Sequence, residues 1–284
     1  PLSTFGLESE TASYRIAVRA LAAGRAPDPA GVRIEDFVNA VDCGYPAILP
    51  HSDATFNVHA EAGPAPFAAG DSVLLKIGVK ARVVGRDGRR PMHLVFVVDS
   101  SGSMGQPDRL PVVRTGIGAL LAGLDPADRV TVIATGGRAR LVVDHAPAAE
   151  AGEIAARLDE LAASGATNLA AGLALGFRQA AARQRPGAVA RVVLCSDGVA
   201  TVGAQTADEL LAGVRTWRVQ GIGCTTVGVG AGAYDDRLLE RLANDGDGRY
   251  LYIDSAESAA TEFVAELGAD LRRVARDVKI QVAF

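Results

Sequence analysis

The sequence predicts an α/β protein: a doubly wound, mostly parallel sheet of the Rossmann-like kind, with a small antiparallel β and helical flanking region. From residue 93 onward, short continuous apolar runs alternate with helix-length segments, which is typical of parallel strands buried on both faces. Before residue 90, the strand patterns alternate apolar and polar residues instead, which favours an antiparallel sheet with one wet face. The five runs span residues 93–98, 130–134, 189–195, 224–229 and 250–253.

Helices are expected between these runs and after the last one. Their apolar residues recur at helical spacing, and the segments lie near residues 110–124, 151–161, 169–183, 207–220, 235–244 and 258–275. Residues 140–143 follow the second run too closely for a helical crossover, so they are predicted to form an antiparallel edge strand reached by a hairpin. We therefore expect the strand order 3-2-1-4-5-6.

The flanking region precedes this pattern and resumes at the C-terminus. Helices are predicted near residues 11–23 and 32–41, and strands near 55–61 and 72–82. Residues 277–284 alternate in the same way, and we expect them to pair with 72–82 in a separate antiparallel sheet. The predicted organisation is therefore a flanking region (1–91), an α/β domain (92–276) and the truncated start of a C-terminal β region (277–284). Both ends of the chain look trimmed.

Composition excludes several classes of protein. The 284 residues include 49% hydrophobic and 22% charged residues, which is ordinary for a folded chain and excludes wholesale disorder. The net charge of −4 is small and evenly spread, so neither nucleic acid nor an anionic membrane is expected as a partner. No run of about 18 apolar residues occurs, so no transmembrane segment is predicted. The 3 cysteines indicate neither a disulfide framework nor a metal knuckle.

The candidate functional residues follow the ends of the predicted strands, where ligands bind in open doubly wound sheets. Asp99, Ser101 and Ser103 come after the first run, two residues apart, so their side chains can project to one side. Asp197 follows the run 189–195, and Thr167 precedes the helix that starts near residue 169. Two carboxylates and three hydroxyls are hard oxygen donors, which suit a hydrated Mg2+ or Mn2+ ion.

Each of the three segments that contain these residues also has a purely structural interpretation. A Ser or Thr at a helix start is usually an N-cap, and an isolated Ser-Asp-Gly is usually a turn. The metal-site interpretation rests on all the pieces meeting at one edge of one predicted sheet.

Two enzymatic alternatives fit less well. A Mg-dependent phosphoryl-transfer hydrolase could use Asp99 as its nucleophile, but Ser101 stands where such enzymes carry a second acid, and no lysine lies between Lys80 and Lys279. A serine hydrolase would need a G-x-S-x-G elbow, which is absent around both Ser101 and Ser103. The sequence therefore predicts a protein that is not an enzyme.

The pattern D-x-S-x-S, followed by a Thr and then an Asp, resembles the metal-ion-dependent adhesion site of von Willebrand factor type A domains. The resemblance covers roughly residues 93–275 and is complete at all five site positions. It implies that Ser101 and Ser103 bind the metal directly and that Thr167 binds it directly or through water. It implies too that Asp99 and Asp197 hold metal-bound waters, while an acidic side chain of a partner takes the last position.

This resemblance implies a function as well. We expect a metal-dependent protein-binding module, for adhesion or complex assembly, that recognises an Asp or Glu of a protein ligand. Residues 1–5, 33–38 and 277–284 resemble a bacterial subfamily with flanking segments on both sides of the domain. An extracytoplasmic location, periplasmic or at the cell surface, is what the family resemblance implies.

Overall fold

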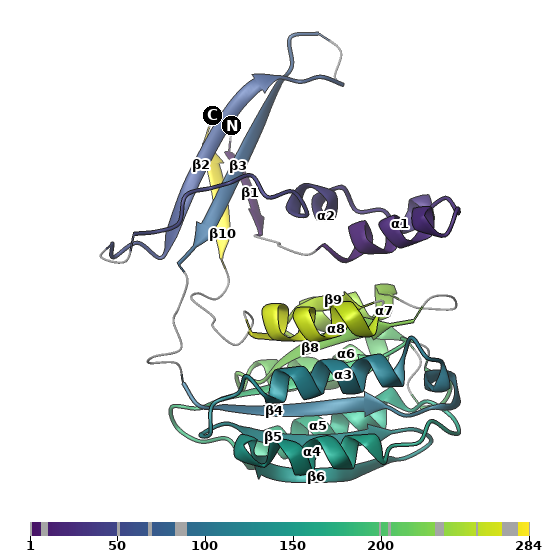
Figure 1. Ribbon diagram of the computed structural model, residues 1–284. Helices are drawn as coiled ribbons and strands as arrows, with labels where there is room; N and C mark the ends of the chain where they lie inside the picture. The colour runs from purple at the N-terminus through teal and green to yellow at the C-terminus, as the bar shows by residue number, and fades with distance from the viewer. Residues whose placement is uncertain are drawn as a thin grey trace. The chain divides into compact units, whose positions relative to one another are not determined.

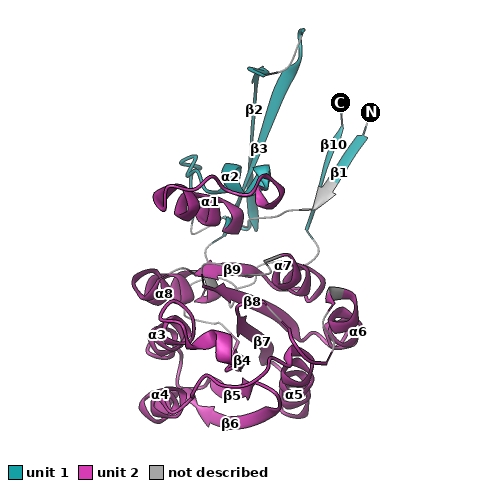
Figure 2. Ribbon diagram, turned by 90° about the vertical axis from the view of Figure 1, so that its right-hand side faces the viewer, with its two compact units in different colours: residues 1–11, 33–89, 272–284 teal, residues 12–32, 90–271 magenta. Residues whose placement is uncertain are grey.

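The computed structural model describes residues 2–6, 11–49, 52–67, 70–82, 90–198, 200–203, 206–230, 236–253, 255–268 and 278–283. Packing divides the chain into two compact units, coloured separately in Figure 2. One unit comprises Pro1–Thr11, Arg33–Arg89 and Arg272–Phe284, and the other comprises Ala12–Val32 and Arg90–Leu271. The division does not follow chain order, because residues 12–32 belong to the unit that contains the large sheet.

A six-stranded sheet forms the centre of the larger unit (Figure 1). Its strands are β4 (Met92–Asp99), β5 (Arg129–Thr135), β6 (Ala139–Pro147), β7 (Val189–Ser196), β8 (Gly223–Val229) and β9 (Tyr250–Ile253). The spatial order is β6-β5-β4-β7-β8-β9, and every neighbouring pair is parallel except β5 with β6. The predicted order 3-2-1-4-5-6, with one antiparallel edge strand, is confirmed.

Helices cover both faces of this sheet (Figure 2). One face carries α3 (Leu110–Leu121), α4 (Ala151–Asp159) and α8 (Ala256–Glu262), and the other carries α5 (Leu169–Ala182), α6 (Ala207–Arg218) and α7 (Asp236–Asp245). The helix predicted for 258–275 begins earlier, at Ala256, and passes into a π-helical turn, Phe263–Leu267. Residues 269–275 of that prediction lie outside the described residues.

Strand β4 shows why the central runs are apolar throughout. Leu94 and Phe96 belong to the core on the α3 face, whereas Val95 and Val97 belong to the core on the α5 face. All four side chains are completely buried. Burying a side chain of this size stabilises the fold by about 1.5–3 kcal/mol, so a strand with helices on both sides gains at every position.

Helix α5 packs unusually close to the sheet, and this position sets the location of its N-terminus. A Cβ atom at Gly172 or at Gly176 would lie only 2.8 Å from the Val97 side chain. The helix begins after Asn168, whose Oδ1 accepts a hydrogen bond of 3.0 Å from the Ala171 backbone N–H. The segment just before α5, which contains Thr167, is thereby held at the carboxyl edge of the sheet.

The smaller unit contains two antiparallel strand pairs. Strands β2 (Phe56–Pro64) and β3 (Val73–Ala81) confirm the strands predicted near 55–61 and 72–82 and pair with each other, and β1 (Leu2–Gly6) pairs with β10 (Lys279–Ala283). The predicted pairing of 72–82 with 277–284 is therefore wrong. A short connection makes β2 the nearest partner of β3, and β10 instead pairs with a strand whose short sequence, LSTFG, shows no alternation.

Among the described residues, two α-helices lie between β1 and β2 in the chain, the first in the larger unit and the second in the smaller one. Helix α1 (Ala12–Ala22) confirms the helix predicted at 11–23, and α2 (Ile34–Asn39) is shorter than the predicted 32–41. Helix α1 lies against β9, where Arg19 Nη1 donates to the Tyr252 hydroxyl at 3.1 Å. The remaining short helical turns are η1 (Pro29–Gly31), η2 (Gly102–Gly105) and η3 (Ala148–Glu150).

Within the described ranges, no helix combines the length and the apolar character needed to span a membrane.

Candidate metal centre

The two predicted acids meet at the carboxyl edge of the central strands. Asp99 is the last residue of β4, and Asp197 directly follows Ser196, the last residue of β7. The strands are parallel neighbours with Val98 opposite Cys195, so Asp99 and Asp197 lie at the same edge of the sheet, one residue apart in register. Both acidic residues are completely buried. This is the switch point of the sheet, since successive strands are added on opposite sides of β4.

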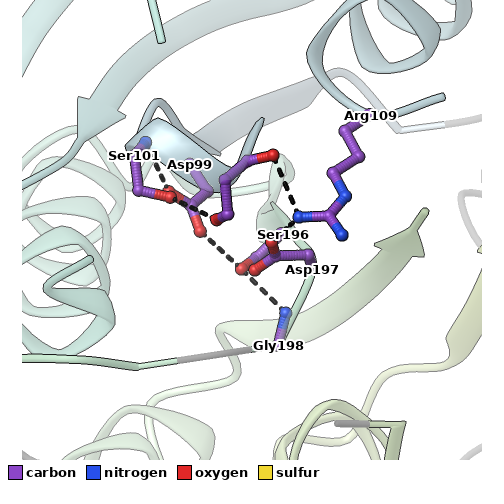
Figure 3. A network of polar contacts seen from close by, with 7 residues as sticks. Asp99, Ser101, Arg109, Ser196, Asp197 and Gly198 are labelled. Atoms are coloured by element: carbon purple, nitrogen blue, oxygen red, sulfur yellow. Dashed lines mark hydrogen bonds and ion pairs between the residues drawn. The ribbon is translucent and has the colours of Figure 1, made fainter. Parts of the chain in front are cut away.

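Asp99 is held by hydrogen bonds to both carboxylate oxygens (Figure 3). Oδ1 accepts from the Ser101 backbone N–H at 2.9 Å, and Oδ2 accepts from the Ser196 hydroxyl at 2.7 Å. The Ser196 hydroxyl oxygen in turn accepts from the Gly198 N–H at 3.0 Å. Burial raises the pKa of Asp99 to about 6, while the bonds from Ser196 and Ser101 act in the opposite direction. A cation nearby would favour the ionised form further.

Ser101 and Ser103 lie in the turn that leaves β4. Ser101 immediately precedes the short helix η2, and its hydroxyl oxygen lies 3.1 Å from that of Ser103. Ser101 is buried, whereas Ser103 is exposed. The hydroxyl pair therefore leads from the buried carboxylates to the protein surface.

Thr167 is held at the same edge through the backbone. Gly102 N–H donates to the Gly165 carbonyl at 2.9 Å, and Ser164 N–H donates to the Ser100 carbonyl at 2.8 Å. These bonds hold the segment before α5 against the turn that carries the serines. Thr167 is 2% exposed, and its backbone N–H donates to the Thr201 hydroxyl at 2.8 Å.

Arg109 is a member of this cluster that the sequence analysis missed. It stands just before α3, and its Nη1 lies 2.5 Å from Asp197 Oδ2 and donates to the Ser103 carbonyl at 2.9 Å (Figure 3). The side chain is largely buried, so this is a buried ion pair. A search for metal ligands passes over arginine, because it is a cation. The available signal was a basic residue shortly after the segment that contains Ser101 and Ser103.

The donor chemistry fits a hard, hydrated cation. In the part of the chain that the structure describes, no three or more His, Cys, Asp or Glu side chains gather as a metal-binding group. The predicted centre has two carboxylates, so hydroxyl oxygens and water must supply the other ligands, as Mg2+ and Mn2+ allow. Asp197 forms an ion pair with Arg109, whereas the hydrogen-bond donors to Asp99 are neutral groups, so the two buried carboxylates can accommodate further positive charge.

Comparisons with known proteins agree with this architecture. The family model described as von Willebrand factor type A domain matches residues 93–266, and a second model, described as von Willebrand factor, matches residues 1–75. YfbK of Escherichia coli is 32% identical over 289 residues, covering 100% of this chain and 50% of that protein. The protein sll0103 of Synechocystis is 36% identical over 125 residues, covering 44% of this chain and 29% of that protein. The chain thus spans half or less of the length of these relatives.

Solved structures share the fold at low sequence identity. A von Willebrand factor type A protein from Catenulispora acidiphila superposes with a TM-score of 0.56 at 17% identity, covering 78% of this chain and 51% of that one. The pilus adhesin SpaC from Lactobacillus rhamnosus GG also gives 0.56 at 17% identity, covering 80% of this chain and 35% of that one. The first family model covers more than half of the chain, including every residue of the candidate centre. The chain therefore belongs to the von Willebrand factor type A domain family.

Proposed function

We propose that this protein is a metal-dependent protein-binding module. A divalent cation, Mg2+ or Mn2+, is held by Asp99, Ser101, Ser103, Thr167 and Asp197, and an Asp or Glu of a protein partner completes its coordination. The observation that carries the proposal is the meeting of two buried carboxylates with a hydroxyl pair that reaches the surface. This arrangement places negative charge below the site and leaves its outer side open to a ligand.

Each residue has a defined task in this proposal. Neutral hydroxyls at Ser101 and Ser103 bind the ion directly, while Asp99 and Asp197 accept hydrogen bonds from the waters that the ion retains. The Ser196 hydroxyl and the Ser101 N–H orient Asp99. When bound, the cation supplies a Lewis-acid position for an incoming carboxylate oxygen. Neutral direct ligands leave that position electrophilic.

Family membership supports an interaction role. SpaC, which shares the fold, is described as a pilus adhesin, and this agrees with a module that binds another protein. The partner of the present protein is defined in the proposal by its chemistry alone, as an exposed carboxylate.

The alternative of a phosphoryl-transfer hydrolase finds less support at Asp99. Both oxygens of that carboxylate accept hydrogen bonds, from Ser101 N–H and from Ser196 Oγ, and the residue is completely buried. A covalent nucleophile must itself reach the phosphorus atom of the substrate, whereas a carboxylate that acts through metal-bound water need not. We infer that Asp99 orients ligands and does not attack them.

Cation binding is tested with Mn2+ and electron paramagnetic resonance. Ser101→Ala removes a proposed metal ligand and should weaken Mn2+ binding by about tenfold or more. The matched control is Ser100→Ala, since that hydroxyl in the same turn is directed at the Thr135 carbonyl, 3.4 Å away. Equal affinity in wild type and Ser101→Ala would refute the assignment of the site.

Partner recognition is tested by retention of proteins on the immobilised chain in Mg2+ and in EDTA. Release by EDTA, together with loss of retention in Asp99→Ala, is the expected result. Retention that survives both changes would remove the metal from the mechanism. A screen with phosphate monoesters and acyl esters in Mg2+ tests the enzymatic alternative, which would be established by turnover that Asp99→Asn abolishes.

A further inference from the structure

Arg109 places a permanent positive charge inside the candidate metal centre. Its Nη1 contacts both Asp197 Oδ2, at 2.5 Å, and the Ser103 carbonyl, at 2.9 Å (Figure 3). The guanidinium therefore connects the turn after β4 with the end of β7, two segments that supply the predicted ligands. An arginine stays protonated in proteins, so this charge is present whether or not a metal is bound.

The surroundings of Arg109 keep its side chain in place. Arg109 is only 9% exposed. Gly230 lies against it with φ of +98°, and a Cβ atom at that position would come within 2.6 Å of Arg109 Nε. A glycine at this point therefore makes room for the guanidinium stem. Because the charge is buried and enclosed, solvent screens its effect on the centre only weakly.

We propose that Arg109 is a built-in counter-charge that weakens the hold of the site on its cation and makes the loaded site selective for an anionic ligand. The inference rests on the proposed function. Asp99 and Asp197 together balance the charge of a divalent ion, so a loaded centre without Arg109 would be neutral overall. With Arg109 the loaded centre carries one excess positive charge, which a carboxylate neutralises and a neutral ligand does not.

A purely structural role would predict the opposite response to mutation. If Arg109 served only to position Asp197, removing it would misplace that carboxylate and weaken cation binding. If it acts through its charge, removing it relieves electrostatic repulsion and strengthens cation binding. The direction of the change in Mn2+ affinity therefore separates the two roles.

The first experiment measures Mn2+ binding by electron paramagnetic resonance in Arg109→Gln and Arg109→Lys. We expect Arg109→Gln to bind Mn2+ at least about tenfold more tightly than wild type, and Arg109→Lys to stay within about threefold of it. The control is Arg140→Gln, which removes the same charge from an exposed position on edge strand β6 and should leave the affinity unchanged. Weaker or unchanged binding in Arg109→Gln, or tighter binding in Arg109→Lys, would overturn the proposal.

The second experiment measures anion selectivity with acetate as the probe. Acetate that coordinates Mn2+ on the protein has its methyl proton resonance broadened, and neutral acetamide serves as the comparison. We expect Arg109→Gln to bind acetate about tenfold more weakly than wild type when both are saturated with Mn2+. Equal acetate affinity in the two proteins would overturn the selectivity part of the proposal.

The outcomes distinguish this inference from the proposed function. Failure of wild type to bind Mn2+ would overturn both, whereas Mn2+ binding by wild type with no gain in Arg109→Gln overturns only the role of Arg109. Circular dichroism and urea unfolding verify that each variant is folded. Arg109→Met, an apolar replacement of similar length, provides the same charge removal if the glutamine variant does not fold.

Discussion

Two polar clusters lie at opposite ends of the central sheet, and they differ in the charge of the side chains that form them. At the carboxyl edge, Asp197 forms an ion pair with Arg109, and the neighbouring Asp99 accepts a hydrogen bond from the Ser196 hydroxyl. At the amino edge, the cluster consists of the buried His93 ring, the half-buried His145 ring and the buried Thr131 hydroxyl. Burial is the largest influence on the pKa of His93, which falls to about 3, so this ring is neutral at physiological pH.

The amino-edge cluster joins three neighbouring strands. His93 Nε2 lies 2.9 Å from the Thr131 hydroxyl, which also accepts from the His145 backbone N–H at 3.1 Å. The two imidazole rings meet edge to face, with centroids 4.4 Å apart. Burial lowers the pKa of His145 as well. The comparison teaches that Asp197 and Arg109 form a buried ion pair in which opposite charges compensate each other, whereas the buried His93 ring, which lies against the Thr131 hydroxyl, stays neutral.

The largest expected effect comes from breaking the buried ion pair at the carboxyl edge. In EDTA, Asp197→Ala should lower the free energy of unfolding by about 3–5 kcal/mol, because it leaves Arg109 buried without its partner. Urea denaturation measures this change. The double variant Asp197→Ala/Arg109→Met should regain most of the loss, and a double variant as unstable as the single one would show that the ion pair is not the source.

Acidification should act on the amino edge. Below pH 6.5, the ordinary pKa of histidine, the unfolded chain binds a proton at His93. The folded chain does not bind this proton until about pH 3. Acidification therefore stabilises the unfolded state, and the stability contributed by neutral His93 falls as pH falls. The stability advantage of wild type over His93→Gln should therefore shrink by about 2–3 kcal/mol between pH 6.5 and 4.5.

Asp99 at the carboxyl edge changes the free energy of unfolding with pH in the opposite direction over the same pH range. Without metal, the folded state binds a proton at Asp99 near pH 6, whereas the unfolded state does so only near its usual value, so this group favours folding as pH falls. Its contribution cancels when wild type and His93→Gln are compared by urea unfolding at each pH. An advantage of wild type that stays constant with pH would contradict the neutral state assigned to His93.

The smallest expected effects come from removing one hydroxyl at each edge. Ser196→Ala removes a donor to a carboxylate and should cost about 2 kcal/mol, whereas Thr131→Val removes a partner of neutral groups and should cost about 1 kcal/mol. Thermal or urea unfolding in EDTA compares the two. A larger loss of stability in Thr131→Val than in Ser196→Ala would contradict the expectation that the hydroxyl bonded to a carboxylate contributes more.

Much of the fold followed from local patterns. The five apolar runs predicted the five parallel strands of the large sheet, because a strand with helices on both faces must be apolar at nearly every position. The short link before β6 predicted its hairpin, and the alternation of runs and helices predicted the doubly wound class, whose usual strand order the sheet has. The edge strand extends beyond the predicted 140–143, to Ala139–Pro147.

The sequence predicted those residues of the candidate centre that directly follow the ends of strands. Asp99 and Asp197 could be placed at one edge because parallel strands deliver their carboxyl ends together. Ser101 and Ser103 were identified by their spacing in the turn that leaves β4.

What the sequence determined by itself was therefore the alternation of strands and helices, the order of the large sheet and the residues at its carboxyl edge. Only the tertiary structure decided that Arg109 meets Asp197, 88 positions away, and that β10 pairs with β1 at the other end of the chain. The burial pattern of a strand or helix is visible in its own sequence, because the spacing of its apolar residues follows the faces that are buried. The alternation of strands and helices limits where a parallel strand can join a doubly wound sheet, but no comparable pattern limits an ion pair between distant side chains or the pairing of β1 with β10.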